Sequence, residues 1–355
     1  MPVFVGYDTS PSNVLGEAYR AMREPAKQEK FLLAGDTTFQ PSRQHLREKI
    51  AQHGAVIVGT SSPGRNAHVE IMALELGIEL GLKLVVVEDT FFSALRIKDK
   101  ELRLKVDLIC VISLIEVGEI KDAFPNARVV VVGNPMWDSY FKPAHRQTAR
   151  NFIDASDNHF VVGVFGTKTT GINMALAVPT LIGLRDTILP DKLEPFFVFG
   201  PHPGENDPKR GAIAVHPDVY RQLAFLVGDM KFVVLPPEVK ADTVIPGLNA
   251  VVDYGNSSAG IHAIARRIPL LSMMVPGARE FLLQEIGRKQ SITTAASASL
   301  EITSGTPQEL SGALQAFARW KHETNTRLAQ EKFLAPRTEG ESARLIAEAI
   351  ESLES

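Results

Sequence analysis

Short apolar runs alternate along the chain with longer segments in which apolar residues recur at helical spacing. Uninterrupted apolar runs of this length are typical of parallel strands that are buried on both faces. In the first half the expected strands are residues 3–5, 31–33, 56–58, 84–87, 108–112 and 129–132. Segments whose pattern predicts a helix, such as residues 66–80, separate several of them. The repetition of strand, helix and strand predicts right-handed βαβ units and a doubly wound parallel sheet.

The alternation restarts after a polar stretch, residues 142–158, which shows no clear period. Domain boundaries tend to fall in such stretches, so we expect the linker and hinge here. Beyond it the pattern predicts strands at 160–165, 196–199, 232–234, 250–252 and 270–274, and helices at 172–188, 219–227, 259–267 and 307–329. A last helix is expected at 342–353, where Leu345, Ile346, Ala349 and Ile350 share helical spacing. The sequence thus predicts two Rossmann-like domains, residues 1–141 and 158–338.

Composition narrows the class of protein. The 355 residues suffice for two domains, and 45% hydrophobic with 22% charged residues is typical of a globular protein. Proteins that bind nucleic acid or anionic membranes usually carry an excess of basic residues. The net charge of −3 shows no such excess, so we do not expect either as the main partner. The single cysteine, Cys110, lies in an apolar run and is interpreted as a buried small hydrophobe that forms no internal disulfide. No signal peptide and no apolar run of roughly 20 residues is evident, so we expect a cytoplasmic enzyme or binding protein.

Ligands of open α/β sheets bind beyond the carboxyl ends of the strands, so the loops that follow the strands carry the candidate chemistry. Residues 166–171, Gly-Thr-Lys-Thr-Thr-Gly, follow an expected strand and open a helix. Backbone amides of Gly166 and Thr167 near a helix start would attract phosphate, and Lys168 would add a charge. The segment lacks the Gly-Lys-Ser/Thr ending of a Walker loop, and an ordinary turn is the alternative.

The next loop, residues 200–205, reads Gly-Pro-His-Pro-Gly-Glu. Two prolines stiffen it and fix the direction of the His202 imidazole, which is a candidate ligand contact; a structural turn is the alternative. We do not expect His202, Glu205 and Asp207 to bind a metal, because three such residues in one polar turn are usually solvated.

Two more loops of the second half open helices. In residues 256–260, Asn-Ser-Ser-Ala-Gly, the residues Ser257, Ser258 and Gly260 would contact phosphate oxygens, or the serines would cap the helix. Arg279, in the loop after the strand at 270–274, either contacts the ligand or pairs with a surface carboxylate.

Four residues of the first half are placed for acid/base chemistry. Asp8 follows the first expected strand, His68 begins a helix, and Glu88 and Asp89 follow the fourth expected strand. Each could equally be a helix cap or a solvated loop residue.

Taken in order, these loops resemble the GT-B superfamily, and within it the nonhydrolysing UDP-N-acetylglucosamine 2-epimerases and related glycosyltransferases. Residues 130–138, Val-Val-Val-Gly-Asn-Pro-Met-Trp-Asp, are similar to the segment that ends the family's first domain. Residues 257–261 are similar to its phosphate loop, and residues 305–310 and 339–346 to its closing segments. The resemblance implies two Rossmann-like domains that face each other across a cleft and close over a ligand. It also implies that residues 340–355 return to the first domain as a helix.

The sequence departs from the epimerases at the positions that carry their chemistry. Residues 59–62, Gly-Thr-Ser-Ser, stand where the family has Gly-Asp-Thr/Ser with a catalytic aspartate. Residues 166–168 replace a His-Arg motif, and residues 262–265 replace the Glu-Glu pair that grips the donor ribose. Of the acidic residues that the epimerases carry, only two have a counterpart in this sequence, Glu88 and Glu101.

The resemblance and its departures favour a glycosyltransferase that uses a nucleotide-activated donor and needs no metal or other cofactor. The donor would bind the second domain, and an acceptor of unknown identity would meet a general base, Asp8, Glu88 or Asp89, in the first. The alternatives are a divergent UDP-sugar 2-epimerase and a noncatalytic nucleotide-sugar-binding protein. The sequence does not determine the oligomeric state, and a homodimer is one possibility.

Overall fold

The chain divides into two compact α/β units. The structure is a computed structural model of all 355 residues. It describes the chain apart from residues 25–28, 33–40, 63–67, 168–169, 191, 203–217, 237, 256, 289, 320–323 and 354–355. The first unit comprises Met1–Lys142, Glu285–Gly287 and Leu334–Ser355, and the second comprises Pro143–Gln284 and Arg288–Phe333.

In the described residues, the first unit is built on a six-stranded parallel sheet with the order β2-β1-β3-β4-β5-β6. Its strands are β1 (Pro2–Gly6), β2 (Glu29–Leu32), β3 (Ala55–Val58), β4 (Lys83–Val87), β5 (Leu108–Val111) and β6 (Arg128–Val131). Every residue of β3 and β5 is buried, as expected for strands covered on both faces. Cys110 lies in β5 as a buried free thiol, and its burial raises its pKa to about 12.

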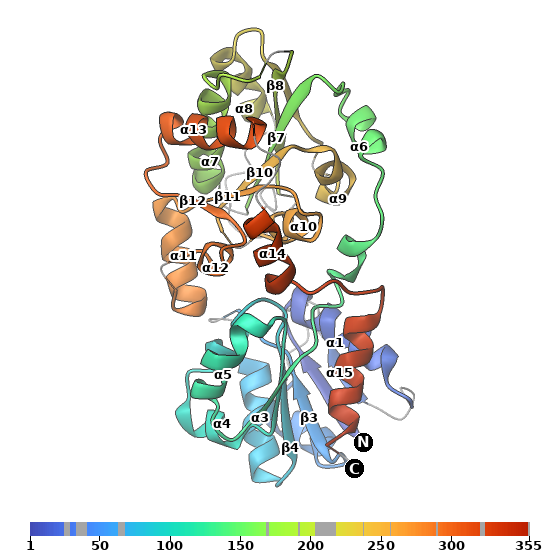
Figure 1. Ribbon diagram of the computed structural model, residues 1–355. Coiled ribbons are helices and arrows are strands. Elements are labelled where there is room, and N and C mark those ends of the chain that lie inside the picture. The colour runs from blue at the N-terminus through green and yellow to red at the C-terminus, as the bar shows by residue number, and fades with distance from the viewer. Residues whose placement is uncertain are drawn as a thin grey trace. The chain divides into compact units, whose positions relative to one another are not determined.

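Helices cover both faces of this sheet (Figure 1). They are α1 (Thr9–Ala21), α2 (Arg43–Ile50), α3 (His68–Glu79), α4 (Lys100–Lys105), α5 (Val117–Ala123) and, from the far end of the sequence, α15 (Glu341–Glu351). Helix α15 lies beside α1, and its Ile346 and Ile350 are buried in one apolar cluster with Val14 and Leu15 of α1. The expected return of the last helix to the first domain is therefore confirmed.

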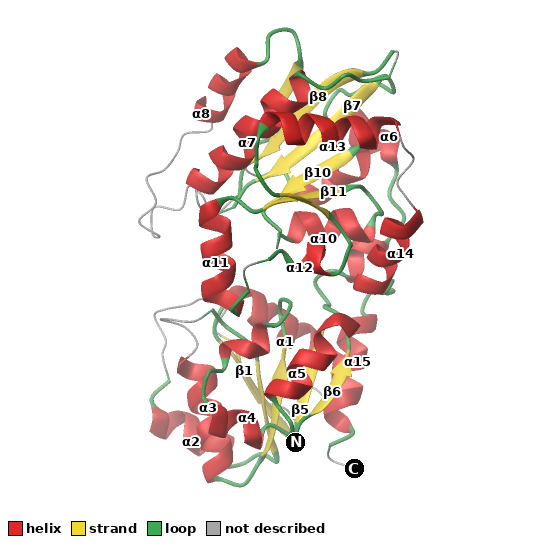
Figure 2. Cartoon of the chain, turned by 60° about the vertical axis from the view of Figure 1, so that its left-hand side comes forward, coloured by secondary structure: helices red, strands yellow, loops and turns green. Residues whose placement is uncertain are grey.

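The second unit has its own six-stranded parallel sheet, in the order β12-β11-β10-β7-β8-β9 among the described residues. Its strands are β7 (His159–Phe165), β8 (Glu194–Gly200), β9 (Lys231–Val234), β10 (Ala250–Asp253), β11 (Leu270–Met273) and β12 (Leu300–Ile302). Its helices are α6 (Arg146–Phe152), α7 (Thr170–Arg185), α8 (Asp218–Arg221), α9 (Ala241–Val244), α10 (Ser258–Ala265), α11 (Pro276–Ile286), α12 (Ile292–Ala295), α13 (Pro307–Arg319) and α14 (Thr324–Phe333). Figure 2 shows helices against both faces of this sheet as well. Two doubly wound parallel sheets are the fold class expected from the sequence.

The stretch expected to be a linker holds a helix instead. Residues 146–152 form α6, whose Arg150 is 1% exposed. The Arg150 guanidinium donates to the carbonyl oxygens of Gly247 at 3.1 Å and His159 at 2.9 Å, and to Asn249 Oδ1 at 2.8 Å. A helix that is anchored by one buried cation rather than by an apolar stripe leaves no hydrophobic period in the sequence.

Candidate functional site

Each sheet has one point at which the chain switches from one side of the starting strand to the other. In the first sheet this switch lies between β1 and β3, and in the second between β7 and β10. Ligands of open α/β sheets bind outside the carboxyl ends of the strands at such a point. The loops of interest are therefore those that follow β1 and β3 in the first unit, and those that follow β7 and β10 in the second.

Asp8 joins the two loops at the switch point of the first sheet. Its backbone amide donates to Ser61 Oγ at 2.8 Å, and its carboxylate accepts the amide of Ser62 at 2.8 Å. Asp8 occupies the cap position of α1, but its side chain makes no capping hydrogen bond to that helix. The half-buried carboxylate thus lies at the carboxyl edge of the sheet, where a ligand would bind.

A buried acid, Glu70, holds these loops by hydrogen bonds, and the sequence analysis did not identify it as a candidate. Glu70 of α3 accepts the amides of Tyr7 at 3.2 Å and Ser61 at 3.0 Å, and the Ser61 hydroxyl at 2.9 Å. Burial raises the pKa of Glu70 to about 8, against the effect of these hydrogen bonds. A carboxylate inside the apolar run Val69-Glu70-Ile71 is the signal that could have identified it.

Glu88 faces inward, toward a second buried acid. Its Oε1 accepts the amide of Ala94 at 2.8 Å, and no N–H or O–H group of the described residues donates to Oε2. Burial, the charge of Glu116 and a hydrogen bond to the Glu116 carboxyl raise the pKa of Glu88 well above its usual range. Burial raises the pKa of Glu116 as well, but its hydrogen bonds oppose this effect, so Glu88 is the member of the pair on which a shared proton is favoured.

Glu116 holds the turn that follows Asp89. It accepts the amides of Phe92 at 2.6 Å, Ile112 at 3.0 Å and Ser113 at 2.7 Å. Phe92 adopts a left-handed backbone conformation with φ of 58°, which is costly for a bulky residue. The Ser-x-x-Glu spacing of residues 113–116 is a capping box, and this motif could have identified Glu116 from the sequence.

Asp89 and His68 have different surroundings. The Asp89 carboxylate is 6% exposed, accepts the Thr60 hydroxyl at 2.8 Å and lies 3.6 Å from Arg96 Nη1. His68 is exposed at the first position of α3, and its ring centroid is 6.2 Å from that of Tyr7. Among the four acid/base candidates, Asp8 and His68 reach solvent at the carboxyl edge, whereas Glu88 and Asp89 are buried beneath it.

In the second unit, the backbone amides of the first candidate phosphate loop already have partners. Gly166 N–H donates to the carbonyl of Gly200 at 2.8 Å, and Thr167 N–H donates to Asn173 Oδ1 at 2.5 Å. Asn173 is fully buried and also donates to the carbonyl of Thr167 at 3.0 Å. The expectation that these two amides are free for phosphate is therefore corrected, because Asn173 and β8 use them. Lys168 lies outside the described residues.

His202 lies next to this loop. A Cβ atom added to Gly166 would stand 3.1 Å from the His202 backbone nitrogen, so the loops after β7 and β8 are in direct contact. His202 itself is half-buried. Glu205 and Asp207 lie outside the described residues. Within the described part of the chain, no group of three or more His, Cys, Asp or Glu side chains could hold a metal ion.

The serine loop caps its helix. Ser257 Oγ accepts the amide of Gly260 at 2.9 Å and donates to Asp253 Oδ2 at 2.8 Å. Asp253 is fully buried at the end of β10, and a Cβ atom at Gly260 would overlap its carboxylate. The capping alternative therefore holds for Ser257, and Gly260 is required by the packing against Asp253. Ser258, the first residue of α10, is exposed.

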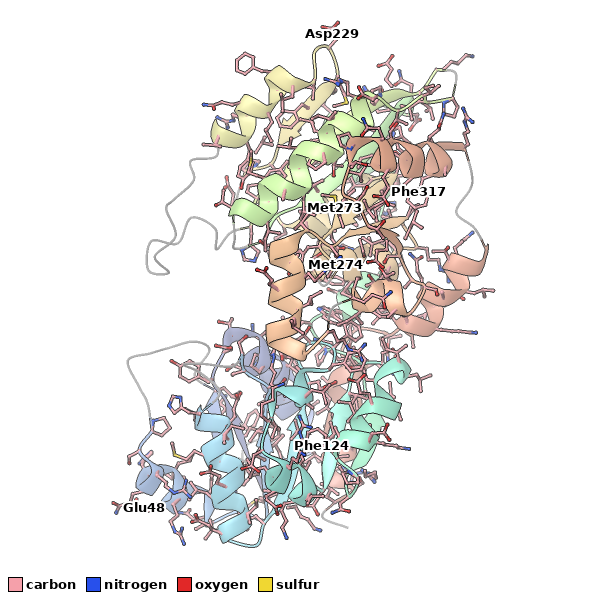
Figure 3. All side chains as sticks on the ribbon, turned by 90° about the vertical axis from the view of Figure 1, so that its left-hand side faces the viewer. Glu48, Phe124, Asp229, Met273, Met274 and Phe317 are labelled. Atoms are coloured by element: carbon pink, nitrogen blue, oxygen red, sulfur yellow. The ribbon has the colours of Figure 1, made fainter. Side chains whose placement is uncertain are left out.

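A cavity of about 470 Å³ lies at the carboxyl ends of β11 and β12. Met273 and Met274, labelled in Figure 3, form part of its wall. Arg279 and Glu280, both exposed in the first turns of α11, also line it. The loop after β12 completes the lining with Thr303, Ser304 and Gly305. The backbone amides of all three donate to the carboxylate of Glu309. Arg279 therefore lines a cavity of ligand size, and no carboxylate of the described residues forms an ion pair with it.

Comparisons by sequence find no match: no known family profile and no curated protein matches the chain. The described helices include none that is both long enough and apolar enough to cross a membrane.

Comparisons of the fold, in contrast, give matches over the whole chain. Anabaena HepE, solved in complex with UDP and glucose, is 11% identical, with 100% of this chain and 99% of that chain covered and a TM-score of 0.56. A putative UDP-N-acetylglucosamine 2-epimerase from Listeria monocytogenes is 13% identical, with 100% and 96% covered and a TM-score of 0.61. MurG from Acinetobacter baumannii is 10% identical, with 99% of both chains covered and a TM-score of 0.61. The chain is similar to these structures over its full length. It therefore has the two-domain α/β fold of the GT-B proteins.

Proposed function

We propose that this protein is a GT-B type glycosyltransferase that transfers a sugar or related group from a nucleotide-activated donor. One observation carries the proposal: a chain with this fold over its full length has a cavity of about 470 Å³, with Arg279 in its wall, at the carboxyl edge of its second sheet. HepE was solved with UDP and glucose, and the volume of the cavity lies within the usual range of small-molecule sites.

The donor side is the second unit. Arg279 offers a fork of N–H donors to diphosphate oxygens, and the exposed Ser258 at the start of α10 offers a hydroxyl and a helix N-terminus. Gly166, Thr167, Ser257 and Gly260 shape the loops around them, and Lys168 and His202 are further candidate contacts. Fixed cationic and dipolar groups of this kind stabilise a leaving diphosphate without a metal ion.

The acceptor side is the first unit, with Asp8 as the general base. Its carboxylate would take the proton of an acceptor hydroxyl while the acceptor oxygen forms a bond to the anomeric carbon. The bond from that carbon to the diphosphate oxygen breaks, and the nucleoside diphosphate leaves with the electron pair. Asp8 is favoured over Glu88 and Asp89 because those two are buried and engaged. The exposed His68 is the second candidate.

The epimerase alternative is weakened by residues 59–62. The Thr60 hydroxyl donates to Asp89, and Ser61 is bound to Glu70, so the polar side chains at this place are part of the scaffold. A noncatalytic nucleotide-sugar-binding protein remains the alternative if binding occurs without turnover.

The test is calorimetric titration with UDP and UDP-glucose, followed by an assay for release of the nucleoside diphosphate with and without EDTA. Arg279→Gln should weaken UDP binding about tenfold, since a charge-assisted hydrogen bond contributes roughly 1.5–3 kcal/mol. Asp8→Asn should keep donor affinity and abolish turnover. The control is Arg185→Gln, because Arg185 is exposed and pairs with Asp186. Unchanged affinity in Arg279→Gln, or full turnover in Asp8→Asn, would contradict the assignment.

A further inference from the structure

A second hollow of ligand size lies at the opposite, amino-terminal edge of the second sheet. This groove has a volume of about 650 Å³. Leu248 and Asn249 come directly before β10, and Ile268 and Pro269 directly before β11. The remaining lining residues come from the region of α6, the segment before β10, the end of α10 and the end of α13.

The groove carries one sign of charge. Four of its lining residues are arginines, Arg146, Arg266, Arg267 and Arg319, and none is acidic. They reach the groove from three helix ends that are far apart in the sequence. The chain as a whole has a net charge of −3, so this concentration of cations does not follow from the composition.

Structural roles account for part of this charge. Arg267 pairs with Glu331 at 2.6 Å, and Arg266 Nε donates to His262 Nε2 at 3.2 Å. Arg319 is in the last turn of α13, where a cation is favoured by the helix dipole.

Arg146 has no such explanation. It stands in the first turn of α6, where the helix dipole disfavours a cation. The pKa of Arg150 is lowered first by burial and then by the nearby charge of Arg146. Within the described part of the chain, neither Arg146 nor Arg319 makes an ion pair, and both side chains are exposed. Two unneutralised guanidinium groups therefore face one groove.

The floor of the groove has a different character from its arginines. Pro246, Leu248, Ile268, Pro269 and Phe317 supply apolar surface; Phe317 is labelled in Figure 3. A guanidinium fork matches the paired oxygens of a phosphate or carboxylate, and an apolar floor favours a hydrocarbon or aromatic body. Small-molecule sites combine apolar walls with a few such polar groups in volumes of about 300–1,000 Å³.

We propose that this groove is a binding site for a small organic anion, an apolar or aromatic body that carries a phosphate or carboxylate group. The site is separate from the proposed donor cavity, because the two hollows lie at opposite ends of β11: the groove at its amino end and the cavity at its carboxyl end. It does not depend on the proposed glycosyl transfer.

The test uses simple probes and the full chain. Phenyl phosphate and phenylacetate are titrated by ligand-observed NMR, with benzyl alcohol as the uncharged analogue. At least one anion should bind, with an affinity that falls as salt rises, and benzyl alcohol should bind at least tenfold more weakly, since the charge-assisted hydrogen bonds are lost. Whichever anion binds more tightly identifies the head group.

The variant Arg146→Gln/Arg319→Gln should weaken that binding about tenfold or more. Arg185→Gln and Arg279→Gln should leave it unchanged, the second because Arg279 belongs to the other cavity. Both substituted arginines of the double variant are exposed, so its thermal midpoint should match that of the wild type. Equal binding by the double variant, equal binding of benzyl alcohol, or no binding of either anion at millimolar concentration would overturn the proposal. So would arginine-dependent capture of anionic vesicles without binding of a small anion.

Discussion

The buried carboxyl groups of Glu88 and Glu116 interact in the core of the first unit, and the two acids take unequal roles. Glu116 accepts three backbone amides and is the carboxylate, whereas Glu88 accepts one amide and holds the proton. Both are almost fully buried, at 1% and 0% exposure. The pair binds the backbone amides of Phe92 and Ala94, so it fixes the turn that follows Asp89.

This asymmetry predicts opposite outcomes for two chemically identical substitutions. Glu88→Gln should change the free energy of unfolding by less than about 1 kcal/mol, because the amide group replaces the carboxylic acid as a donor to Glu116. Glu116→Gln should cost about 2–5 kcal/mol, because an NH₂ group would then face backbone N–H donors. Urea unfolding followed by Trp137 fluorescence in a Trp320→Phe background reports on the first unit. Equal costs for the two variants would contradict the assigned proton.

Glu70 predicts a pH dependence of stability. Its pKa is raised from the model-compound value of 4.5 to about 8 on folding. The folded state therefore binds more protons than the unfolded state between these values, and stability falls as pH rises through that window. The contribution of Glu70 is fully present below pH 4.5 and is lost above about pH 8.

The variant Glu70→Gln isolates this contribution, because it cannot ionise. The free energy of unfolding of the wild type minus that of Glu70→Gln should decrease between pH 5 and pH 8 by an amount on the order of a few kcal/mol, and then level off. The exposed Glu75 of the same helix provides the control, and Glu75→Gln should give a small difference that barely changes over this range. A difference that grows with pH would show that the hydrogen bonds from Tyr7 and Ser61 outweigh burial.

Two helical glycines of the second unit predict effects of opposite sign. Gly260→Ala would push a methyl group into the Asp253 carboxylate, so it should destabilise this unit by about 1–3 kcal/mol. Gly312→Ala in α13 meets nothing within 4 Å and should stabilise it by roughly 0.5–1 kcal/mol. Urea unfolding followed by hydrogen exchange of the amides in β10 and α13 measures both. Tolerance of Gly260→Ala would mean that α10 is free to move away from β10.

Helix α15 predicts a core substitution with a control in the same helix. Ile346 is fully buried in the cluster that includes α1, so Ile346→Ala should lower the stability of the first unit by about 2–5 kcal/mol. Arg344 is exposed and pairs with Glu348, and Arg344→Ala should cost less than about 1 kcal/mol. Hydrogen exchange resolves the site of the effect: protection should fall in α1 and stay constant in α7. Loss confined to α7 would contradict the packing described here.

Apolar pattern alone predicts every described strand of the two sheets except β12, and longer helices such as α3, α7 and α15, because strands buried on both faces leave continuous runs in the sequence. The edge strand β12 is only partly buried and leaves no such run. The pattern also fails where polar groups do the anchoring. Arg150 stabilises α6 through carbonyl oxygens, and such contacts have no period. The expected helix at 307–329 is divided into α13 and α14, and the expected helix at 219–227 continues beyond α8 as a 3-10 helix, Gln222–Leu226.

The candidate loops are predictable for a different reason: their order along a doubly wound chain fixes which sheet edge they share. What the sequence does not show is which of their groups are already engaged. The amide of Thr167 is taken by Asn173, and the hydroxyl of Ser257 by Asp253. Each depends on the path of the loop between the partners, which residue types alone do not determine. Glu70 and Glu116, by contrast, carry readable signals, an acid in an apolar run and a capping box.

The position of α15 has a consequence for how the protein folds during translation. Translation proceeds from the amino end at roughly 5–20 residues per second, and an N-terminal domain ordinarily folds while the rest is still being made. Here Val14, Leu15 and Ala18 of α1 belong to the same apolar cluster as residues of α15, which come more than 300 positions later in the sequence. This contact cannot form until α15 has been synthesised. The first unit therefore leaves the ribosome with an uncovered apolar face until residues Glu341–Glu351, which form α15, have been synthesised. A nascent chain arrested before residue 341 should expose that face to chaperones. The apolar cluster of the second unit lies between Phe160 and Ala318, so all of its residues have been synthesised by then.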